Sequence, residues 1–501
     1  MKRVPLPGSH RSVWPGSRHA APITSERDVL LTAWLRTRKG GTIDAAAARA
    51  IGSVPPLQRT YADRKALEER TAADPADVEA LGRYCESLGI TVGPARWRSL
   101  TLSAPVETLA DAFGADVAIF EDEDLRRFRH RSGALYVPPD IAAIVRGIFG
   151  LHQWPRARRL PPLQRHATPL LASDVAARYA FPDADGSGQT IAVVQLNGTF
   201  DVADFQQCMA AQHLSPAPPV VKRIDDAAIR HERATLQDLE AALDVQIAAS
   251  LAPGARIVVY EAPNDERGFL DALRAAIFDA EHAPSIVSVS YGWPERLWTP
   301  VALDILDDLF AAAALAGVSV FCAAGDNGAE VDAGGRAHVL APASSEFAIA
   351  CGATSIAADA ESAWENTGGG FSARLEAPAW QRGVAAVASR YGVAAGRGLP
   401  DVCAQQSPGY YVVMQGTELA MGGTSAVAPV CAALAARLNQ RIGAPIGFVA
   451  PLLYAPESAS CFTPVTQGGN GRYEAAPGWN PCAGLGTPVG TALEKALGRA
   501  P

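Results

Sequence analysis

The later part of the chain contains short, continuous runs of apolar residues, at 189–198, 255–263, 285–292 and 318–326. Helix-length segments with mixed polar and apolar positions, such as residues 266–282, separate these runs. Strands that are apolar at every position are typical of parallel sheets with helices on both faces. The pattern therefore predicts an α/β domain, in which chemically active groups are expected at the carboxyl ends of the strands.

The earlier part of the chain alternates helical and strand-like segments. Residues 74–89 predict a helix, because Asp74 can cap it and Pro75 suits the first helical position. Residues 96–105 and 116–123 have the period of strands. We therefore expect four parts along the chain: a flexible tail at 1–20, an α+β domain at 21–154, a cleavable Pro- and Arg-rich linker at 155–170, and the α/β domain at 171–501.

The charge is divided unevenly between these parts. Residues 1–160 hold 24 basic and 18 acidic side chains, which leaves 20 basic and 34 acidic ones in the rest of the chain. An acidic main domain argues against nucleic acid as a partner. A basic front and an acidic body are instead expected to attract each other.

Other sequence features exclude several further classes of protein. The first residues are interrupted by Pro and Gly and do not resemble a classical signal peptide. The uncharged, apolar run at residues 309–325 is shorter than a membrane span and divides into a helical half and a strand-like half, so we expect no membrane partner. Eight cysteines in 501 residues are too few for a disulfide scaffold, although Cys461 and Cys482 are candidates for one bridge.

A candidate nucleophile lies in the segment Gly422–Pro429, which reads GGTSAVAP and precedes an Ala- and Leu-rich helical pattern. A small-residue turn of this kind exposes Ser425 beside the amino terminus of a helix. As a turn alone it would more often be a simple helix cap. A serine nucleophile needs a base, but none of the nine histidines lies in the H-G-T-H context that subtilisins use, and the G-x-S-x-G elbow of α/β-hydrolases is absent.

Two acidic segments offer an alternative to histidine. Glu240 and Asp244 are four residues apart in a helical pattern, so they share one face of the helix beside an apolar stripe. An exposed pair of this kind would only aid solubility, whereas a partly buried pair shares a proton and can act as a base. Asp326 follows the apolar run 318–326 in an Asp-Asn-Gly turn. A protonated Asp326 could donate a hydrogen bond to an oxyanion.

The order of these segments resembles the sedolisin family of serine-carboxyl peptidases, and is most similar to its kumamolisin-like branch. The matching segments run E-x-x-x-D, L-A-P-G-A, S-x-S-x-G, A-G-D-x-G, G-G-G-F-S, R-G-L-P-D and G-T-S-A-x-A-P, at residues 240–244, 251–255, 288–292, 324–328, 368–372, 397–401 and 423–429. The resemblance covers nearly the whole chain, with the N-terminal α+β region in the place of the family's prosegment. It implies a subtilisin-like parallel sheet flanked by helices and preceded by an α+β prodomain.

The resemblance implies an acid-active endopeptidase made as a self-processing zymogen. Ser425 would be the nucleophile, Glu240 the general base and acid, Asp244 the carboxylate that orients Glu240, and Asp326 the stabiliser of the oxyanion. The substrate would lie along backbone segments that contain Ser290, Gly292, Gly368, Gly369 and Gly370. Substrates would be proteins or peptides, the prosegment would inhibit within the chain, the protein would be a monomer, and the location would be extracellular.

The sequence departs from the family at the calcium site and next to the carboxylate pair. Pro464 and Asn480 stand where the family has calcium-binding carboxylates, so we expect no tight calcium and no other cofactor. Gln195 stands where some acid-adapted relatives have a glutamate, and Tyr291 where they have a tryptophan. A neutral Gln195 cannot share a proton with the pair, so we expect a higher pH optimum.

Two other functions remain open from the sequence. A sedolisin-like binding protein would keep the fold and have weak or no catalytic turnover. A different acyl hydrolase would use the same nucleophile on other substrates. The four intact residues of the site argue against the first, and the long N-terminal region favours a peptidase over the second, because a protein-degrading enzyme has to be kept inactive during synthesis.

Overall fold

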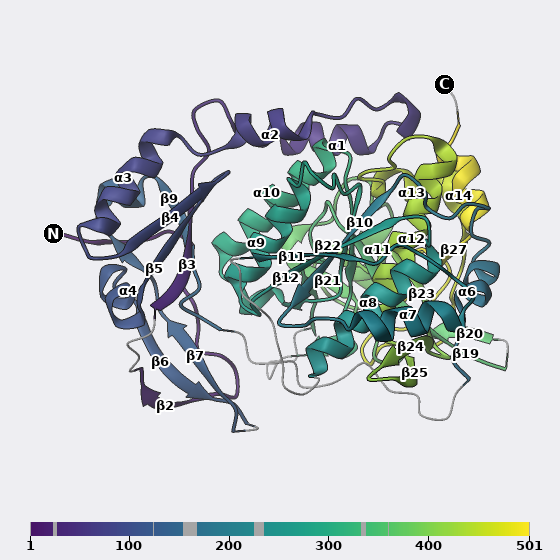
Figure 1. Cartoon of the computed structure of the whole chain (residues 1–501). Helices are drawn as coiled ribbons and strands as arrows, with labels where there is room; N and C mark the ends of the chain where they lie inside the picture. Colours follow the sequence, from purple (N-terminus) through teal and green to yellow (C-terminus); the bar gives the residue numbers. More distant parts are fainter. Residues whose placement is uncertain are drawn as a thin grey trace.

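The computed structural model describes residues 2–23, 28–123, 125–153, 168–224, 235–331, 337–358 and 360–499. The chain forms an N-terminal lobe, drawn in purple and blue, and a larger lobe that contains the rest of the described chain (Figure 1). Most of the predicted linker, residues 155–167, lies outside the described residues.

The larger lobe is built on one sheet of eight strands, which is mainly parallel. The order is β11-β12-β10-β13-β15-β19-β20, and β23 also pairs with β19. The bounds are β10 Thr190–Leu196, β11 Val220–Arg223, β12 Arg256–Ala262, β13 Ile286–Val289, β15 Ser319–Ala323, β19 Ile349–Ala357, β20 Ala360–Ala363 and β23 Val402–Ser407. The four apolar runs are therefore confirmed as neighbouring parallel strands β12, β10, β13 and β15.

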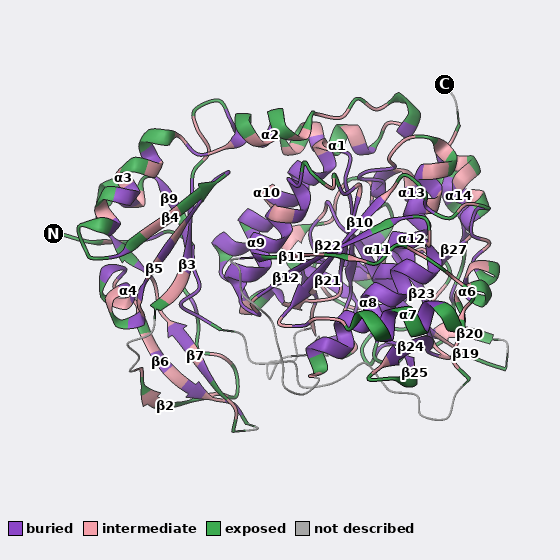
Figure 2. Cartoon of the chain, viewed as in Figure 1, coloured by how far each residue is buried: buried purple, intermediate pink, exposed green. Residues whose placement is uncertain are grey.

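Helices cover this sheet, and its central strands β10, β12, β13 and β15 are buried almost throughout. The helices are α6 Ala172–Arg178, α7 Val202–Ala211, α8 Leu236–Leu251, α9 Glu266–Ile277, α10 Pro300–Leu315, α11 Val384–Arg390, α12 Thr424–Ile442, α13 Ala450–Leu453 and α14 Gly490–Leu497. Helices α8 and α12 pack together, as do α9 and α10. Helices α8, α9 and α12 are buried along most of their length (Figure 2). Because these helices are held between other elements, the side chains on them have fixed positions.

Shorter strands complete the larger lobe around the sheet. They are β14 Trp293–Pro294, β16 Glu330–Val331, β17 Ala337–His338, β18 Leu340–Ala341, β21 Gly370–Glu376, β22 Gly396–Leu399, β24 Tyr410–Met414, β25 Thr417–Met421, β26 Phe462–Thr463 and β27 Thr487–Pro488. Strand β22 pairs with β21 and carries Arg397, which forms a buried ion pair with Asp401 at 2.5 Å. Asp401 also accepts a hydrogen bond from the backbone of Ala350 on β19, so the R-G-L-P-D segment has a structural role here.

The N-terminal lobe has an antiparallel sheet in the order β4-β5-β3-β9 and a smaller sheet β2-β6-β7. Its elements are β1 Val4–Pro5, β2 Arg18–Pro22, β3 Asp28–Leu35, α1 Ala45–Gly52, α2 Arg64–Thr71, α3 Pro75–Glu86, β4 Thr91–Arg96, β5 Ser99–Pro105, α4 Val106–Ala112, β6 Asp116–Glu121, β7 Arg127–Ser132, β8 Tyr136–Val137, α5 Pro139–Ala142 and β9 Val145–Phe149. The predicted start of α3 is confirmed, since the Asp74 side chain accepts from the backbone N–H of Ala76.

The prediction of a flexible tail at residues 1–20 was wrong. Strand β1 pairs with β8, and β2 pairs with β6. Leu6 is buried, and Arg11 forms a buried ion pair with Glu266 of the larger lobe. The segment is ordered by partners more than 100 residues away in the sequence, which its irregular Pro- and Gly-rich pattern does not reveal.

Basic residues of the N-terminal lobe meet acidic residues of the larger lobe. Besides Arg11 and Glu266, the guanidinium of Arg98 lies 2.7 Å from Asp308 on α10. The guanidinium of Arg49 lies 2.6 Å from Glu346. Both α9 and α10 stand between the N-terminal sheet and the central sheet (Figure 1). The uneven charge in the sequence therefore corresponds to ion pairs between the two lobes.

All eight cysteines are free and buried, so the candidate bridge between Cys461 and Cys482 is not formed. Among the described residues, no helix is both long and apolar enough to cross a membrane.

Candidate active site

Three neighbouring strands bring the candidate site to one edge of the central sheet. Gln195 lies near the end of β10, Ser290 directly follows β13, and Asp326 follows β15. Because these parallel strands are adjacent, their carboxyl ends meet at the same edge. Helix α8 brings Glu240 and Asp244, and the first turn of α12 brings Ser425, so residues far apart in sequence meet there.

The carboxylate pair is buried beside the serine. Glu240 is 9% exposed, Asp244 is 0% exposed and Ser425 is 7% exposed. The Ser425 side chain lies close enough to the Glu240 carboxyl to lower its pKa, and within the described part of the chain Glu240 Oε1 has no hydrogen-bond partner. The neighbour of the serine hydroxyl is therefore a buried carboxylate, where an imidazole would stand in a Ser-His-Asp triad.

Two neutral side chains hold Asp244. Ser290 Oγ donates to Asp244 Oδ1 at 2.7 Å, and Gln195 Nε2 donates to Asp244 Oδ2 at 2.7 Å. The Tyr291 hydroxyl donates to Gln195 Oε1 at 2.8 Å, which orients the amide so that its N–H points at Asp244. Ser290 Oγ also lies 3.2 Å from the backbone carbonyl of Ser425. The side chains of Tyr291 and Gln195 therefore form a chain of hydrogen bonds that ends on the Asp244 carboxylate.

Burial has the largest effect on the acidity of the pair. It raises the pKa of Glu240 well above the usual value, and the neighbouring Asp244 carboxylate raises it further. Burial also raises the pKa of Asp244, against the effect of the donors Ser290 and Gln195. Two adjacent buried carboxylates therefore do not stay ionised together, and the pair binds one proton before an exposed carboxylate would.

Asp326 is bound to the residue before the serine. The backbone N–H and the hydroxyl of Thr424 donate to Asp326 Oδ1, at 2.8 and 2.6 Å. The other oxygen faces Gly423, where an added Cβ would come within 2.6 Å of Oδ2. Burial raises the pKa of Asp326, which favours the protonated acid. Thr424 is not among the site residues predicted from the sequence, although its place in the G-T-S segment is a usable signal.

The glycines proposed for substrate binding have structural reasons of their own. An added Cβ at Gly368 would lie 1.9 Å from the Ala324 carbonyl, and one at Gly369 would lie 2.0 Å from the Pro481 carbonyl. Gly370 begins β21 and pairs with Leu399. At Gly292, a Cβ would lie 3.1 Å from the Ala341 carbonyl. The close approach of main chains therefore accounts for Gly368 and Gly369, while the contribution of all four to a substrate cleft stays a prediction.

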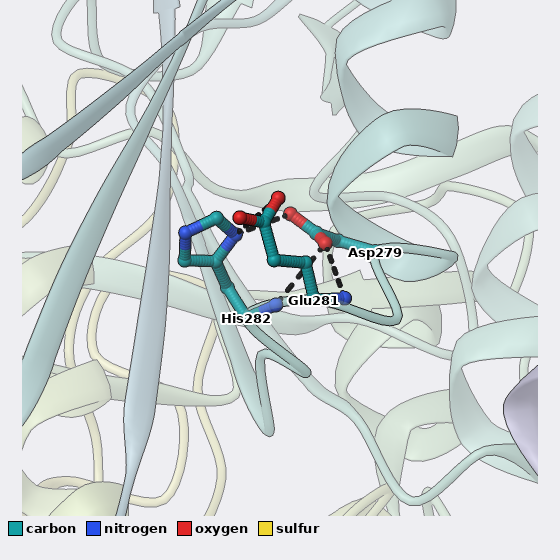
Figure 3. Close-up of side chains that lie close together, drawn as sticks. All are labelled: Asp279, Glu281 and His282. Atoms are coloured by element: carbon teal, nitrogen blue, oxygen red, sulfur yellow. Dashed lines mark hydrogen bonds and ion pairs between the residues drawn. The ribbon is translucent and has the colours of Figure 1, made fainter.

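One cluster of possible metal ligands occurs among the described residues, away from the catalytic candidates in sequence. It consists of Asp279, Glu281 and His282, which point toward one another (Figure 3). The ammonium of Lys222 lies 3.0 Å from Asp279, 2.9 Å from Glu281 and 3.5 Å from His282. Because this ammonium already pairs with both carboxylates, the cluster is an ion-pair network.

Comparison with known proteins gives matches over both lobes. Residues 15–154 match the family model described as the pro-kumamolisin activation domain, and residues 237–452 match the subtilase family. Kumamolisin of Bacillus sp. (strain MN-32) is 37% identical over 99% of this chain and 96% of its own length. Tripeptidyl-peptidase 1 of Canis lupus familiaris is 31% identical over 52% of this chain and 52% of its own.

A solved structure agrees with the sequence comparisons. Pseudomonas sedolisin, a serine-carboxyl proteinase solved in complex with pseudo-iodotyrostatin, is 25% identical to this chain. The match covers 66% of this chain and 98% of sedolisin, with a TM-score of 0.57. The larger lobe is thus a subtilisin-like α/β domain, and the N-terminal lobe is a prosegment. The chain belongs to the sedolisin family of serine-carboxyl peptidases, in its kumamolisin-like branch and with an N-terminal activation prosegment.

Proposed function

We propose that this protein is an acid-active serine endopeptidase, made as a zymogen that cleaves itself. The observation that carries the proposal is the placement of Ser425 against the buried carboxylate of Glu240, with Asp326 beside the same turn. The related proteins are peptidases, which supports hydrolysis of peptide bonds. The prosegment acts as the intramolecular inhibitor, and proteins or peptides are the substrates.

Ser425, Glu240 and Asp326 account for each step of the reaction, and Asp244 orients Glu240. Ser425 Oγ attacks the peptide carbonyl carbon while its proton passes to Glu240. The carbonyl oxygen becomes an oxyanion, which accepts a hydrogen bond from protonated Asp326. Glu240 then gives the proton to the leaving amine, and the C–N bond breaks to leave an acyl-serine. Water, with Glu240 again as base, hydrolyses this ester and restores Ser425.

Activity requires an ionised carboxylate at Glu240 and a protonated carboxyl group at Asp326. Glu240 must be ionised to accept the serine proton, so activity falls as acid protonates Glu240. Asp326 must keep its proton, so activity falls when alkali removes it. Because the pKa of Glu240 is raised, activity should begin to fall at a higher pH as the solution is acidified. Gln195 is a neutral donor, so it adds no proton that the Glu240 and Asp244 carboxylates could share. We therefore expect an optimum that is acidic but higher than that of relatives with a glutamate there.

Endopeptidase activity separates this proposal from a tripeptidyl-peptidase activity like that named for some relatives. After activation at about pH 4, near the range in which carboxylates titrate, the enzyme is given one long peptide with a free amino terminus and the same peptide acetylated. We expect both to be cut at the same internal bond, as mass spectrometry would show. Release of tripeptides from the free peptide alone would contradict an endopeptidase.

We also propose that the family's calcium site has been replaced by a side-chain amide. Asn480 is 2% exposed, and its Nδ2 donates to the carbonyls of Val465 at 3.2 Å and Ala476 at 2.9 Å. Its Oδ1 accepts from the backbone N–H groups of Cys482 and Ala483, at 3.1 and 2.9 Å. Carbonyls that accept an amide hydrogen are not free to bind a cation, so these residues do not fit a tight calcium site.

The calcium proposal predicts that a chelator leaves the protein unchanged. The melting temperature should be the same with EDTA as with added calcium, and elemental analysis after dialysis should find no bound calcium. Asn480→Asp should lower the unfolding free energy by about 1–3 kcal/mol, because two buried carbonyls lose their donor. Calcium that is retained in stoichiometric amount by the dialysed protein would overturn the proposal.

A further inference from the structure

Two histidines of the prosegment form a buried pair directly behind the contact between the lobes. His130 lies on β7, and His152 follows β9. They are 1% and 3% exposed, and their Nδ1 atoms are 3.0 Å apart. Since a neutral imidazole carries one N–H, one ring donates through Nδ1–H and the other accepts at Nδ1. This hydrogen bond therefore exists only while at least one of the two Nδ1 atoms lacks a proton.

The surroundings of the pair disfavour positive charge. Burial, followed by Arg11 and Arg131, lowers the pKa of His130 to about 4. Burial also holds the pKa of His152 well below the usual range, with Arg11 as the next cause. The charged groups around the pair are Arg11, Arg129 and Arg131, then Asp116 on β6, and Asp265, Glu266 and Arg267 at the start of α9. Cations outnumber anions there, so protonation of either imidazole adds a positive charge to a buried site that already has an excess of positive charge.

The histidine pair lies beside the arginines that connect the prosegment to the larger lobe. Arg11 reaches across to Glu266 and to the carbonyl of Leu297, at 3.0 Å for the latter. Arg131 donates to the carbonyl of Ser9 at 2.7 Å, which holds the segment that carries Arg11. Loss of order at β7 would therefore release the side chains that attach this part of the prosegment to α9.

The core around the two rings is small. A cluster of three buried residues, Ala118, Phe120 and Phe128, packs with Trp14. The Trp14 ring stacks on His152, with centroids 6.0 Å apart, and the Phe120 ring meets His130 at 4.8 Å. The sheet β2-β6-β7 has little other apolar burial of its own. Two charged imidazoles buried in such a small apolar core would destabilise the packing of the sheet.

We propose that His130 and His152 are an acid sensor of the prosegment: protonation of both rings breaks their hydrogen bond and opens the sheet β2-β6-β7 where it meets the catalytic lobe. The proposal rests on the zymogen function proposed above. An unfolded histidine has a pKa near ~6.5, so the stability that the neutral pair provides is complete above that pH and is lost as the pH falls below it. The loss therefore begins at about pH 6.5, above the range in which most carboxylates titrate, and continues down to the folded pKa of His130, about 4.

The test is hydrogen exchange of β7 measured by mass spectrometry between pH 6 and pH 5, in full-length protein with Ser425→Ala so that no self-cleavage occurs. After correction for intrinsic rates, the opening constant should rise about 100-fold per unit fall in pH, which is the slope for two protons. His130→Asn and His152→Asn each keep an amide donor near the Nδ1 position. Each should reduce the slope to about tenfold. His10→Gln, at an exposed prosegment histidine, should leave it unchanged.

Each outcome decides the proposal. Equal slopes in the parent and in both asparagine variants would overturn it, as would a flat parent profile. If an asparagine variant does not fold at neutral pH, the pH dependence of the parent still tests the proposal. The proposal requires that the opening constant of the parent change with pH as expected for the uptake of two protons. Exchange is measured without catalysis, so failure of the peptidase function would be detected separately, as an inert wild-type protein whose β7 still opens in acid.

Discussion

The Ser425→Ala zymogen is expected to stay at full length when the protein is brought to about pH 4, near the range in which carboxylates titrate, while the wild type loses its prosegment. Without the hydroxyl there is no nucleophile for Glu240 to activate, and no acyl-enzyme forms. Peptidase activity should fall by at least about 10³-fold, since nucleophile, base and oxyanion donor act as a unit. Intact mass and cleavage of an acetylated peptide measure the two effects.

A matched control keeps this result specific. Ser389→Ala changes an exposed serine on α11 and should process and cleave like the wild type. If the wild type also remains intact and inert in acid, the sedolisin-like binding protein considered from the sequence becomes the better description. If Ser425→Ala processes itself normally, Ser425 is not the nucleophile.

The Glu240→Gln variant should lose about 10²–10⁴-fold in kcat/KM, the usual contribution of a general base. The amide has the same size but cannot take the proton of the Ser425 hydroxyl, so the fold and the melting temperature should change little. Glu457→Gln, at an exposed glutamate, should retain the wild-type rate. A Glu240→Gln enzyme with the wild-type rate would show that another group is the base.

The pH profile adds a separate check on the pair. The Asp244 carboxylate raises the pKa of Glu240, so Asp244→Asn should move the acid limit of kcat/KM to lower pH. The direction follows because removal of a negative neighbour makes Glu240 easier to ionise. An acid limit that stays in place would mean that Asp244 does not act on Glu240 through its charge.

Much of the fold follows from local patterns. Four apolar runs predicted four parallel strands, and the spacing of Glu240 and Asp244 placed both on one face of α8. These predictions succeeded because they depend on the repeat of a strand or a helix over a few residues. The order of the short motifs identified the family, and no single motif was sufficient.

Contacts between distant segments were beyond the reach of these patterns. The bond between Thr424 and Asp326 joins residues 98 positions apart, and the ion pair of Arg11 with Glu266 joins residues 255 apart. The pattern of residues 1–20 predicts a tail, because it contains no sign of the strands β8 and β6 with which this segment pairs. Likewise, the loss of two carboxylates predicted a weak calcium site, but only the fold shows the Asn480 amide bonded to the carbonyls there.

The sequence by itself therefore determined the elements, the family and the residues that could react. The tertiary structure decided their environment: Asp244 between Ser290 and Gln195, Glu240 buried against Ser425, and two histidines facing each other behind an interface. The physical reason is that a residue's own atoms set which hydrogen bonds it can donate or accept. Its burial, and with it its pKa, is set by side chains that only folding brings near.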